Sequence, residues 1–236
     1  MVERFVFAYA KQNMGSFLVV TSEKKNQYHH GELREALLAA AEEILDEGGI
    51  QGLSLRACAR RAGVSHAAPK HHFNDVANLL AEVAARGFSR LSRALRKARE
   101  EVVDDPEDRF IATARTYVTF ARDYPAYFRL MFRSDALNLK NEALTSAAAE
   151  TFTEMTNTIT VQRHQPDVTP ENLVERIREE RLSVDVLIGW SHIHGYAQLL
   201  LEGQLDVFAA GEDPDVFLER TLTQTGRRIS QVLQKG

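Results

Sequence analysis

The chain has 236 residues, of which 44% are hydrophobic and 26% charged, an ordinary composition for a globular protein with a buried core in one large domain or two small ones. Its single cysteine, Cys58, excludes an internal disulfide and agrees with a reducing cytoplasm, and we interpret it as a small packed residue rather than a nucleophile. The net charge of −4 is uneven, since residues 1–101 hold 15 Lys+Arg against 12 Asp+Glu and residues 102–236 hold 14 against 21, so only the amino-terminal part is expected to meet a polyanion.

The first residues carry two apolar runs, FVFAYA and FLVV, that raise the question of a targeting signal. Lys11, Gln12 and Asn13 separate them, so neither run reaches the roughly 7 to 15 residues of a signal-peptide core. We therefore expect residues 1–27 to form a flexible tail, with Met14 as an alternative start.

The next segment shows helix signals with a period of 3.6 residues. An apolar stripe over residues 33–45 predicts a first helix that ends at Gly48 and Gly49. Ser54 can cap a short second helix that runs through Arg61.

A sharp reversal is predicted after the second helix. Gly63 can take the left-handed conformation that the reversal requires, and Val64 can bury at the corner. Ser65 is expected to cap the next helix, with Pro69 in its first turn, where a missing N–H costs least. Asp75, after Asn74, is then expected to begin a longer helix.

The rest of the chain is also predicted to be helical. Three pairs place a capping side chain before a proline that needs no N–H donor: Asp105-Pro106, Thr169-Pro170 and Asp213-Pro214. We expect helices near residues 106–123, 125–133, 136–163, 170–202 and 214–234. No strand pattern of period two appears, so the predicted fold class is all-α.

The segment 182–201 is long and apolar enough to raise the question of a membrane span, since Asp185 is its only formal charge. The segment is interrupted by polar residues: Ser183, Ser191, His192, His194 and Gln198. A buried helix at the centre of a soluble bundle is therefore the favoured interpretation.

The segment RAGVSHAAPKHHF, residues 61–73, carries the functional prediction. Its short helix offers small side chains next to hydrogen-bond donors, so the backbone could approach a DNA groove while the donors reach phosphates and base edges. Residues 51–73 hold four Lys or Arg and no Asp or Glu. The pattern indicates a helix-turn-helix whose second helix enters the major groove, and the alternative is a solvated connector with fortuitous histidines.

Several spaced motifs resemble one protein family. YHHGELREALLAAAEEILDEGG, followed by LSLRACARRAGVSHAAPKHHF, closely resembles the amino-terminal DNA-binding domain of TetR/AcrR-type transcriptional regulators. YPAYFRLMFRSD at 124–135 and GWSHIHG at 189–195 resemble the branch whose ligand-binding domain is named for Trp, His and Gly, here Trp190, His194 and Gly195.

The resemblance implies a helix-turn-helix DNA-binding domain of three helices at 28–76 and a helical ligand-binding and dimerisation domain at 77–236. The sequence has no HExxH, no CxxC and no phosphate-cradling glycine loop, so no metal or cofactor is expected. The partners would be a near-palindromic DNA operator, a second copy of the chain and a small-molecule effector, with no membrane. The expected DNA-contacting residues are His29, His30, Ser54, Arg56, Ser65, His66, Ala67, Ala68, Lys70, His71 and His72.

Two residues depart from the family pattern. Lys70 stands where the recognition helix usually has tyrosine, and Val76 stands where the next helix usually begins with lysine. We predict that Lys70 partly replaces both phosphate contacts.

Arg86, Arg90, Arg93 and Lys97 recur on one helical face. A solvated stripe is the favoured interpretation of this face, and a second DNA contact is the alternative.

The carboxy-terminal part concentrates aromatic residues between 117 and 132. Most of them are expected in the core, but as a set they could line an apolar pocket with a few polar groups, as small-molecule sites do. The residues expected at such a site are Tyr117, Phe120, Tyr124, Tyr127, Phe128, Met131, Trp190 and His194. The resemblance implies that an apolar ligand there weakens DNA binding.

The last two predicted long helices carry more apolar surface than a peripheral helix needs. Along residues 214–234 the apolar positions are Val216, Leu218, Leu222, Ile229, Val232 and Leu233. In the family such a pair of helices forms a four-helix bundle with its twofold mate, which makes a dimer.

Two other classes of function are weaker alternatives. A hydrolase could combine Ser183 or Ser191 with His192 and Asp185, but no nucleophile elbow accompanies them. A helical adaptor could bind another protein through its acidic surface. The prediction is a cytoplasmic, dimeric transcriptional regulator that is no enzyme, with specific DNA binding as the discriminating test.

Overall fold

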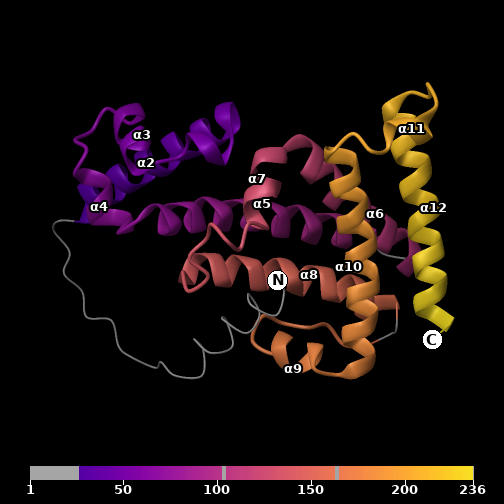
Figure 1. The fold of residues 1–236 in the computed structure, drawn as a ribbon. Coiled ribbons are helices and arrows are strands. Elements are labelled where there is room, and N and C mark those ends of the chain that lie inside the picture. The colour runs from indigo at the N-terminus through magenta and orange to yellow at the C-terminus, as the bar shows by residue number, and fades with distance from the viewer. Residues whose placement is uncertain (1–26, 103–104, 163–164, 236) are drawn as a thin grey trace. The chain divides into compact units, whose positions relative to one another are not determined.

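The computed structural model describes residues 27–102, 105–162 and 165–235, with side chains from residue 32 to residue 233 (Figure 1). Within these ranges every regular element is a helix and there is no strand, which confirms the predicted all-α fold class. The expected tail at 1–27 lies outside the described residues apart from Gln27, the first residue of α2 (Gln27–Gly48).

The chain divides into two compact units. The first unit holds the described residues up to Phe88 together with residues 126–148, and the second holds residues 89–125 together with those from 149 onward. Two long helices, α5 (Val76–Glu101) and α8 (Glu142–Gln162), contribute residues to both units.

The first unit is built around α2, and Figure 1 shows α2, α3 and α4 grouped together. Its other elements are the 3₁₀ helix η1 (Ile50–Gly52), α3 (Leu55–Arg61), α4 (Ala68–Phe73) and α7 (Pro125–Met131). The predicted cap of α3 is confirmed, because Ser54 Oγ accepts a hydrogen bond from the Ala57 N–H at 3.1 Å. Gly63 has a φ of 69°, the left-handed conformation that the turn requires.

The prediction that Ser65 caps the next helix was wrong. The N-cap of α4 is Ala67, which makes no side-chain hydrogen bond. A turn precedes the helix instead, since the Ser65 carbonyl accepts from the Ala68 N–H at 3.0 Å. The predicted cap of α5 is confirmed, because Asp75 Oδ1 accepts a hydrogen bond from the Asn78 N–H at 2.8 Å.

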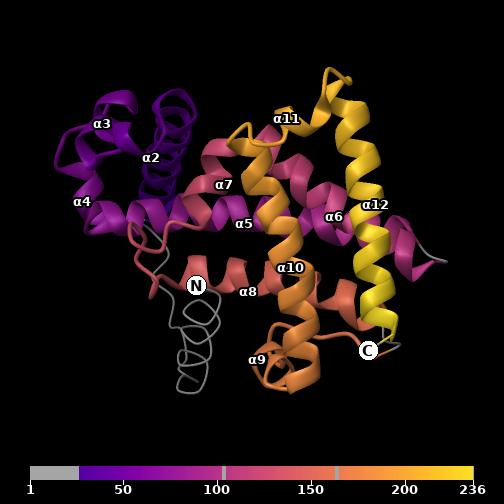
Figure 2. The ribbon, with the colours of Figure 1, turned by 45° about the vertical axis from the view of Figure 1, so that its right-hand side comes forward.

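The second unit contains α6 (Pro106–Asp123), α9 (Leu173–Ile177), α10 (Glu180–Leu201), α11 (Asp206–Ala209) and α12 (Pro214–Lys235), besides its parts of α5 and α8. α6 packs against both α10 and α12. Figures 1 and 2 show α10 and α12 running side by side. The predicted caps Asp105 and Asp213 are confirmed, since each accepts two backbone N–H hydrogen bonds.

Some predicted boundaries were wrong. The expected helix 170–202 is two helices, because Glu179 adopts an extended backbone (φ −64°, ψ 114°) between α9 and α10. Thr169 does not cap α9, whose N-cap is Asn172. α8 begins at Glu142 rather than 136, since Asn141 Oδ1 accepts from the Leu144 N–H at 3.0 Å.

The deeply buried helix is α8, not the segment 182–201 as predicted. Residues 151–160 of α8, TFTEMTNTIT, are all buried except the half-buried Met155. α10 instead has one buried face and leaves Val184, Leu187 and Leu199 exposed. No helix among the described residues has the length and apolarity to cross a membrane.

Candidate nucleic-acid interface and ligand cavity

The short helix α4 is held to the first unit by two residues. Pro69 and Phe73 are its only buried side chains, and the ring of Phe73 lies under the Arg34 guanidinium, 5.7 Å from the ring centroid. Every other residue of α4 and of the turn before it reaches solvent. Ser65, His66, Ala67, Lys70 and His71 are exposed, and Ala68 and His72 are half-buried.

The cations of the helix-turn-helix fall into two groups. Arg61 is bound to α2, with Nη1 3.2 Å from Glu43 Oε2 and Nη2 2.6 Å from Glu47 Oε2. The hydrogen bond from Arg61 lowers the pKa of the Glu47 carboxyl. Among the described residues no acidic side chain pairs with the exposed Arg56, Arg60 or Lys70, and these three cations remain open to a polyanion.

Arg60 was absent from the predicted contact residues. It lies four residues after Arg56, so the two guanidinium groups emerge from the same side of α3. This spacing of four residues could have identified Arg60 from the sequence. Of the other predicted contacts, Ser54 is the α3 cap, and the side chains of His29 and His30 lie outside the described residues although their backbone belongs to α2.

Three of the four basic residues of the stripe along α5 make intramolecular contacts. Arg86 pairs with Glu35 and Glu42 of α2 in the first unit. In the second unit, the Arg90 guanidinium lies 6.0 Å from the Tyr124 ring centroid and Lys97 Nζ lies 3.7 Å from Glu101 Oε1. These contacts favour a structural role for the stripe over a second DNA contact.

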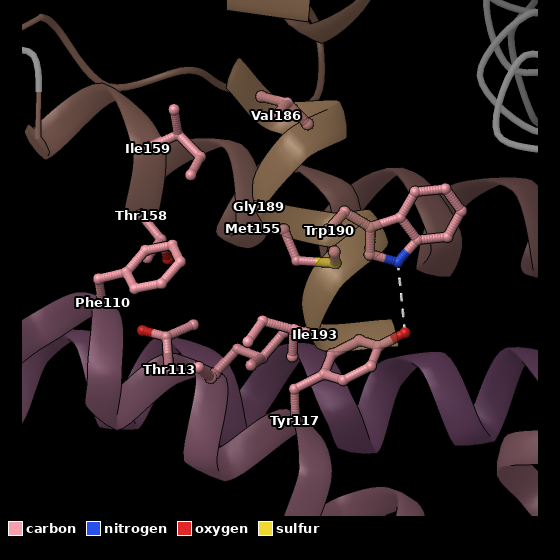
Figure 3. A pocket seen from close by; sticks show the side chains of 12 residues that line it. Phe110, Thr113, Tyr117, Met155, Thr158, Ile159, Val186, Gly189, Trp190 and Ile193 are labelled. Carbon is pink, nitrogen blue, oxygen red and sulfur yellow. Dashed lines mark hydrogen bonds between the residues drawn. The ribbon is translucent and has the colours of Figure 1, made fainter. Parts of the chain in front are cut away.

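A cavity that is partly open to solvent lies within the second unit, between α5, α6, α8 and α10 (Figure 3). Its volume is about 40 Å³, enough for roughly three water molecules. None of the side chains around it is charged. The lining residues are Leu95, Phe110, Thr113, Ala114, Tyr117, Met155, Thr158, Ile159, Val186, Gly189, Trp190 and Ile193.

A chain of polar side chains lies along one wall of the cavity. Trp190 Nε1–H donates to Tyr117 Oη at 3.3 Å, the dashed line in Figure 3, and Tyr117 Oη lies 2.8 Å from His194 Nδ1. Gln198 Nε2 lies 3.4 Å from His194 Nε2. Burial lowers the pKa of His194 and raises that of Tyr117, so both groups are neutral near pH 7.

The two threonines of the lining have hydrogen bonds within their own helices. Thr113 Oγ1 donates to the Arg109 carbonyl at 2.8 Å, and Thr158 Oγ1 donates to the Glu154 carbonyl at 3.0 Å. Together with Tyr117 and Trp190, every polar side chain of the lining therefore already has a hydrogen bond.

The structure brings together only part of the predicted ligand-binding set. Tyr117 and Trp190 line the cavity, and His194 is bonded to Tyr117. Phe120 and Tyr124 pack on each other in the same unit, with ring centroids 5.2 Å apart.

The other three predicted residues lie in the first unit. Phe128 packs on Phe132, with centroids 5.1 Å apart, and Tyr127 and Met131 lie beside Gly87. These side chains are fully buried in that core, because large aromatic residues contribute most when they are packed.

Sequence reasoning missed the residues that form most of the cavity: Phe110, Met155, Thr158, Ile159, Gly189 and Ile193. The available signal was Gly189, a glycine inside a long helix, which usually has a packing or functional reason. A Cβ atom there would lie 3.0 Å from Ile159 Cδ1 and 3.7 Å from Phe110 Cε2.

The described residues contain no group of three or more side chains placed to hold a metal ion. Ser183 Oγ and Ser191 Oγ each donate to a carbonyl of their own helix, at 2.8 and 3.2 Å. His192 Nδ1 lies 2.7 Å from the Ile188 carbonyl. No hydrolase triad forms from these three side chains, since each is bonded to helix backbone.

Comparisons with known proteins agree on one family. The family described as "Bacterial regulatory proteins, tetR family" matches residues 37–83, and that described as "Tetracyclin repressor-like, C-terminal domain" matches residues 110–225. The HTH-type transcriptional regulator YobS of Bacillus subtilis is 30% identical over 98 residues, which are 42% of this chain and 50% of that protein.

Two solved structures extend the comparison. A protein of unknown function from Rhodococcus sp. RHA1 is 32% identical with a TM-score of 0.69, and the match covers 89% of this chain and all of the other. The TetR family transcriptional regulator PfmR from Thermus thermophilus is 19% identical with a TM-score of 0.53, over 83% of this chain and 97% of the other. The second likeness concerns the fold alone.

Proposed function

Because this chain belongs to the TetR family of DNA-binding transcriptional regulators, we propose that it is a dimeric repressor that a small apolar ligand releases from its operator. The carboxy-terminal match is consistent with the Trp-His-Gly branch, whose marker residues here are Trp190, His194 and Gly195. As a regulator of transcription it would act in the cytoplasm, where the operator is.

The observation that carries the DNA-binding role is the exposed surface of α3, the Gly63 turn and α4. It presents Arg56, Arg60 and Lys70 with no acidic partner among the described residues, and its small residue Ala67 leaves room for close approach to a groove. Positive side chains supply affinity for phosphates, and the short helix supplies contacts to base edges.

The proposed dimer rests on the outer faces of α10 and α12. α10 exposes Val184, Leu187 and Leu199, and α12 exposes Val216 and Val232. The other apolar residues of α12 named from the sequence are buried against the protomer. A second copy that covers the remaining face would remove exposed apolar side chains from water and pair two DNA-reading heads.

The proposed ligand control rests on the cavity and on α5. Leu95 of α5 lines the cavity, and the same helix begins at Val76, three residues after α4 ends. We take the protein to have two states that differ in the position of α5, only one of which fits the operator. A ligand that binds the other state more tightly would weaken DNA binding, at most by the ratio of its affinities for the two states.

The first experiment titrates the purified protein into labelled duplex from its own upstream region, with excess unrelated competitor DNA and at two salt concentrations. Retained nanomolar binding would support a sequence-reading regulator. Binding that any competitor removes equally would contradict specific recognition of that duplex.

Lys70→Ala is expected to weaken the salt dependence of DNA binding. One lost phosphate contact lowers the slope of log affinity against log salt by roughly one, so a dimer with two heads should lose about two. The slope is measured by fluorescence anisotropy from about 50 to 200 mM salt. A slope equal to that of the wild type would remove Lys70 from the phosphate contacts.

Leu187→Glu is expected to convert the dimer to a monomer. The side chain is 59% exposed in the protomer, so the change leaves the fold intact but would bury a charge in the proposed interface. Light scattering at about 10 μM checks the mass, with Arg93→Glu on α5 as the control. A wild type that is already monomeric, or a dimeric Leu187→Glu variant, would contradict this interface.

A further inference from the structure

From the polar groups around the cavity we infer that its ligand is a small, uncharged, hydrocarbon-like molecule without a carbonyl or similar hydrogen-bond acceptor, bound in the cavity that Gly189 helps to line. This inference rests on the proposed ligand control of DNA binding and names the chemical class of ligand that the site accepts.

The lining offers no counter-charge to an ionised ligand. None of the twelve lining side chains is charged. Glu154, next to the lining residue Met155, is 5% exposed and is bound by Arg96 Nε at 2.7 Å and Arg99 Nε at 3.1 Å. A carboxylate or ammonium group in the cavity would lose its hydration without a partner, which is strongly unfavourable.

The lining also offers few hydrogen-bond donors to a ligand acceptor. The hydroxyl protons of Thr113 and Thr158 are donated to helix carbonyls, and the Trp190 N–H is donated to Tyr117. A ligand carbonyl would have to break one of these bonds or remain unpaired, and an unpaired buried polar group weakens binding. A hydrocarbon has no acceptor that needs a partner.

Gly189 lets one wall of the cavity pack directly on helix backbone. Glycine inside a helix costs about 1 kcal/mol relative to alanine, yet Gly189 lies on the buried face of α10. An added methyl group would lie 3.0 Å from Ile159 Cδ1 and 3.7 Å from Phe110 Cε2, so Ile159 would have to move. Because Ile159 also lines the cavity, a side chain at position 189 would change the shape of the site.

The cavity of about 40 Å³ is smaller than the 300–1,000 Å³ or so of typical ligand sites, so binding must enlarge it. Met155, Val186 and Trp190 are the lining side chains of α8 and α10 that are only half-buried. Of these, the unbranched methionine changes rotamer with little strain. A compact ligand that needs a small expansion is favoured over a large one.

Three compounds that share one benzene ring test the inference: toluene, acetophenone and benzoate at pH 7.5. Trp190 is the only tryptophan of the chain and lines the cavity, so its fluorescence reports binding without DNA. Toluene is expected to bind most tightly, acetophenone about tenfold more weakly because its carbonyl finds no donor, and benzoate at least about 100-fold more weakly. Benzoate binding as tight as toluene, or no response to saturating toluene, would overturn the inference.

A matched pair of glycine variants locates the site. Gly189→Ala is expected to weaken toluene binding at least about tenfold, because the methyl group would displace the lining residue Ile159. Gly195→Ala adds the same methyl group to the same helix, at a position where nothing lies within 4 Å, and should leave toluene affinity unchanged. Equal toluene affinity in wild type and Gly189→Ala would place the ligand elsewhere.

Release of labelled operator DNA is measured separately, by anisotropy. Toluene that binds at Trp190 but does not release DNA would contradict the proposed ligand control and leave the inferred ligand class standing. If benzoate releases DNA without changing Trp190 fluorescence, the inferred site is wrong, but the proposed control of DNA binding by a ligand is not contradicted.

Discussion

Replacing Phe73 with alanine is expected to lower the free energy of unfolding of the first unit by about 3–5 kcal/mol and to abolish operator binding. Phe73 is 1% exposed and is, with Pro69, one of the two residues that attach α4 to the rest of the unit. Helix α4 has only six residues, too few to persist without tertiary packing. Loss of the ring would leave a cavity and free the DNA-reading helix.

Urea unfolding checks this expectation with two probes, because a chain with two units need not unfold in one transition. Far-UV circular dichroism follows the whole chain, and Trp190 fluorescence follows the second unit, to which that residue belongs. Phe208→Ala is the control, since the same truncation at a side chain 71% exposed should change stability by less than about 0.5 kcal/mol. A Phe73→Ala protein that unfolds like the wild type and still binds DNA would refute the role given to this ring.

The helix boundaries that could be predicted are those set by local chemistry. Ser54, Asp75, Asp105 and Asp213 cap helices as expected, because a side-chain oxygen that satisfies an orphan N–H depends only on neighbouring residues. Ser65 has the same chemistry but does not cap, since a turn stabilised by its carbonyl delays the start of α4. The sequence pattern does not show which of two competing local hydrogen bonds forms.

The buried helix could not be identified from hydropathy. Residues 151–160 of α8 contain five threonines, one glutamate and one asparagine, a composition expected at a surface. Thr156 and Thr158 donate their hydroxyls to carbonyls four residues earlier, and Asn157 is bonded to the backbone of Val168. These internal hydrogen bonds offset the cost of burying the polar groups that form them.

The proposed DNA-reading surface could be located from the sequence more fully than the proposed ligand cavity. Its residues are contiguous in sequence, from Ser54 to Phe73, so the absence of acidic side chains can be seen directly in the sequence. The cavity instead joins residues of four helices from Leu95 to Ile193, and only the packing of α6, α8 and α10 decides which aromatic residues line it. Tyr127 and Phe128 illustrate this limit, because they are core residues of the other unit.

Ala67→Glu is expected to weaken operator binding at least about 100-fold while making the protein slightly more stable than the wild type. Ala67 is the exposed N-cap of α4, where a carboxylate interacts favourably with the helix dipole, by about 0.3–1 kcal/mol. On the proposed DNA surface the same carboxylate would face phosphates, and a like-charge contact costs several kcal/mol.

Because stability is expected to rise while operator affinity falls, a loss of binding in Ala67→Glu cannot come from unfolding. Melting temperature and operator affinity are measured for Ala67→Glu and for Ala67→Gln, which has the same size without the charge. Gln is expected to lose less than about tenfold in affinity, since it can still donate a hydrogen bond to phosphate or base. Equal losses in both variants would mean that side-chain size, not charge, limits the approach to DNA, and unchanged affinity in Ala67→Glu would place this turn away from the DNA.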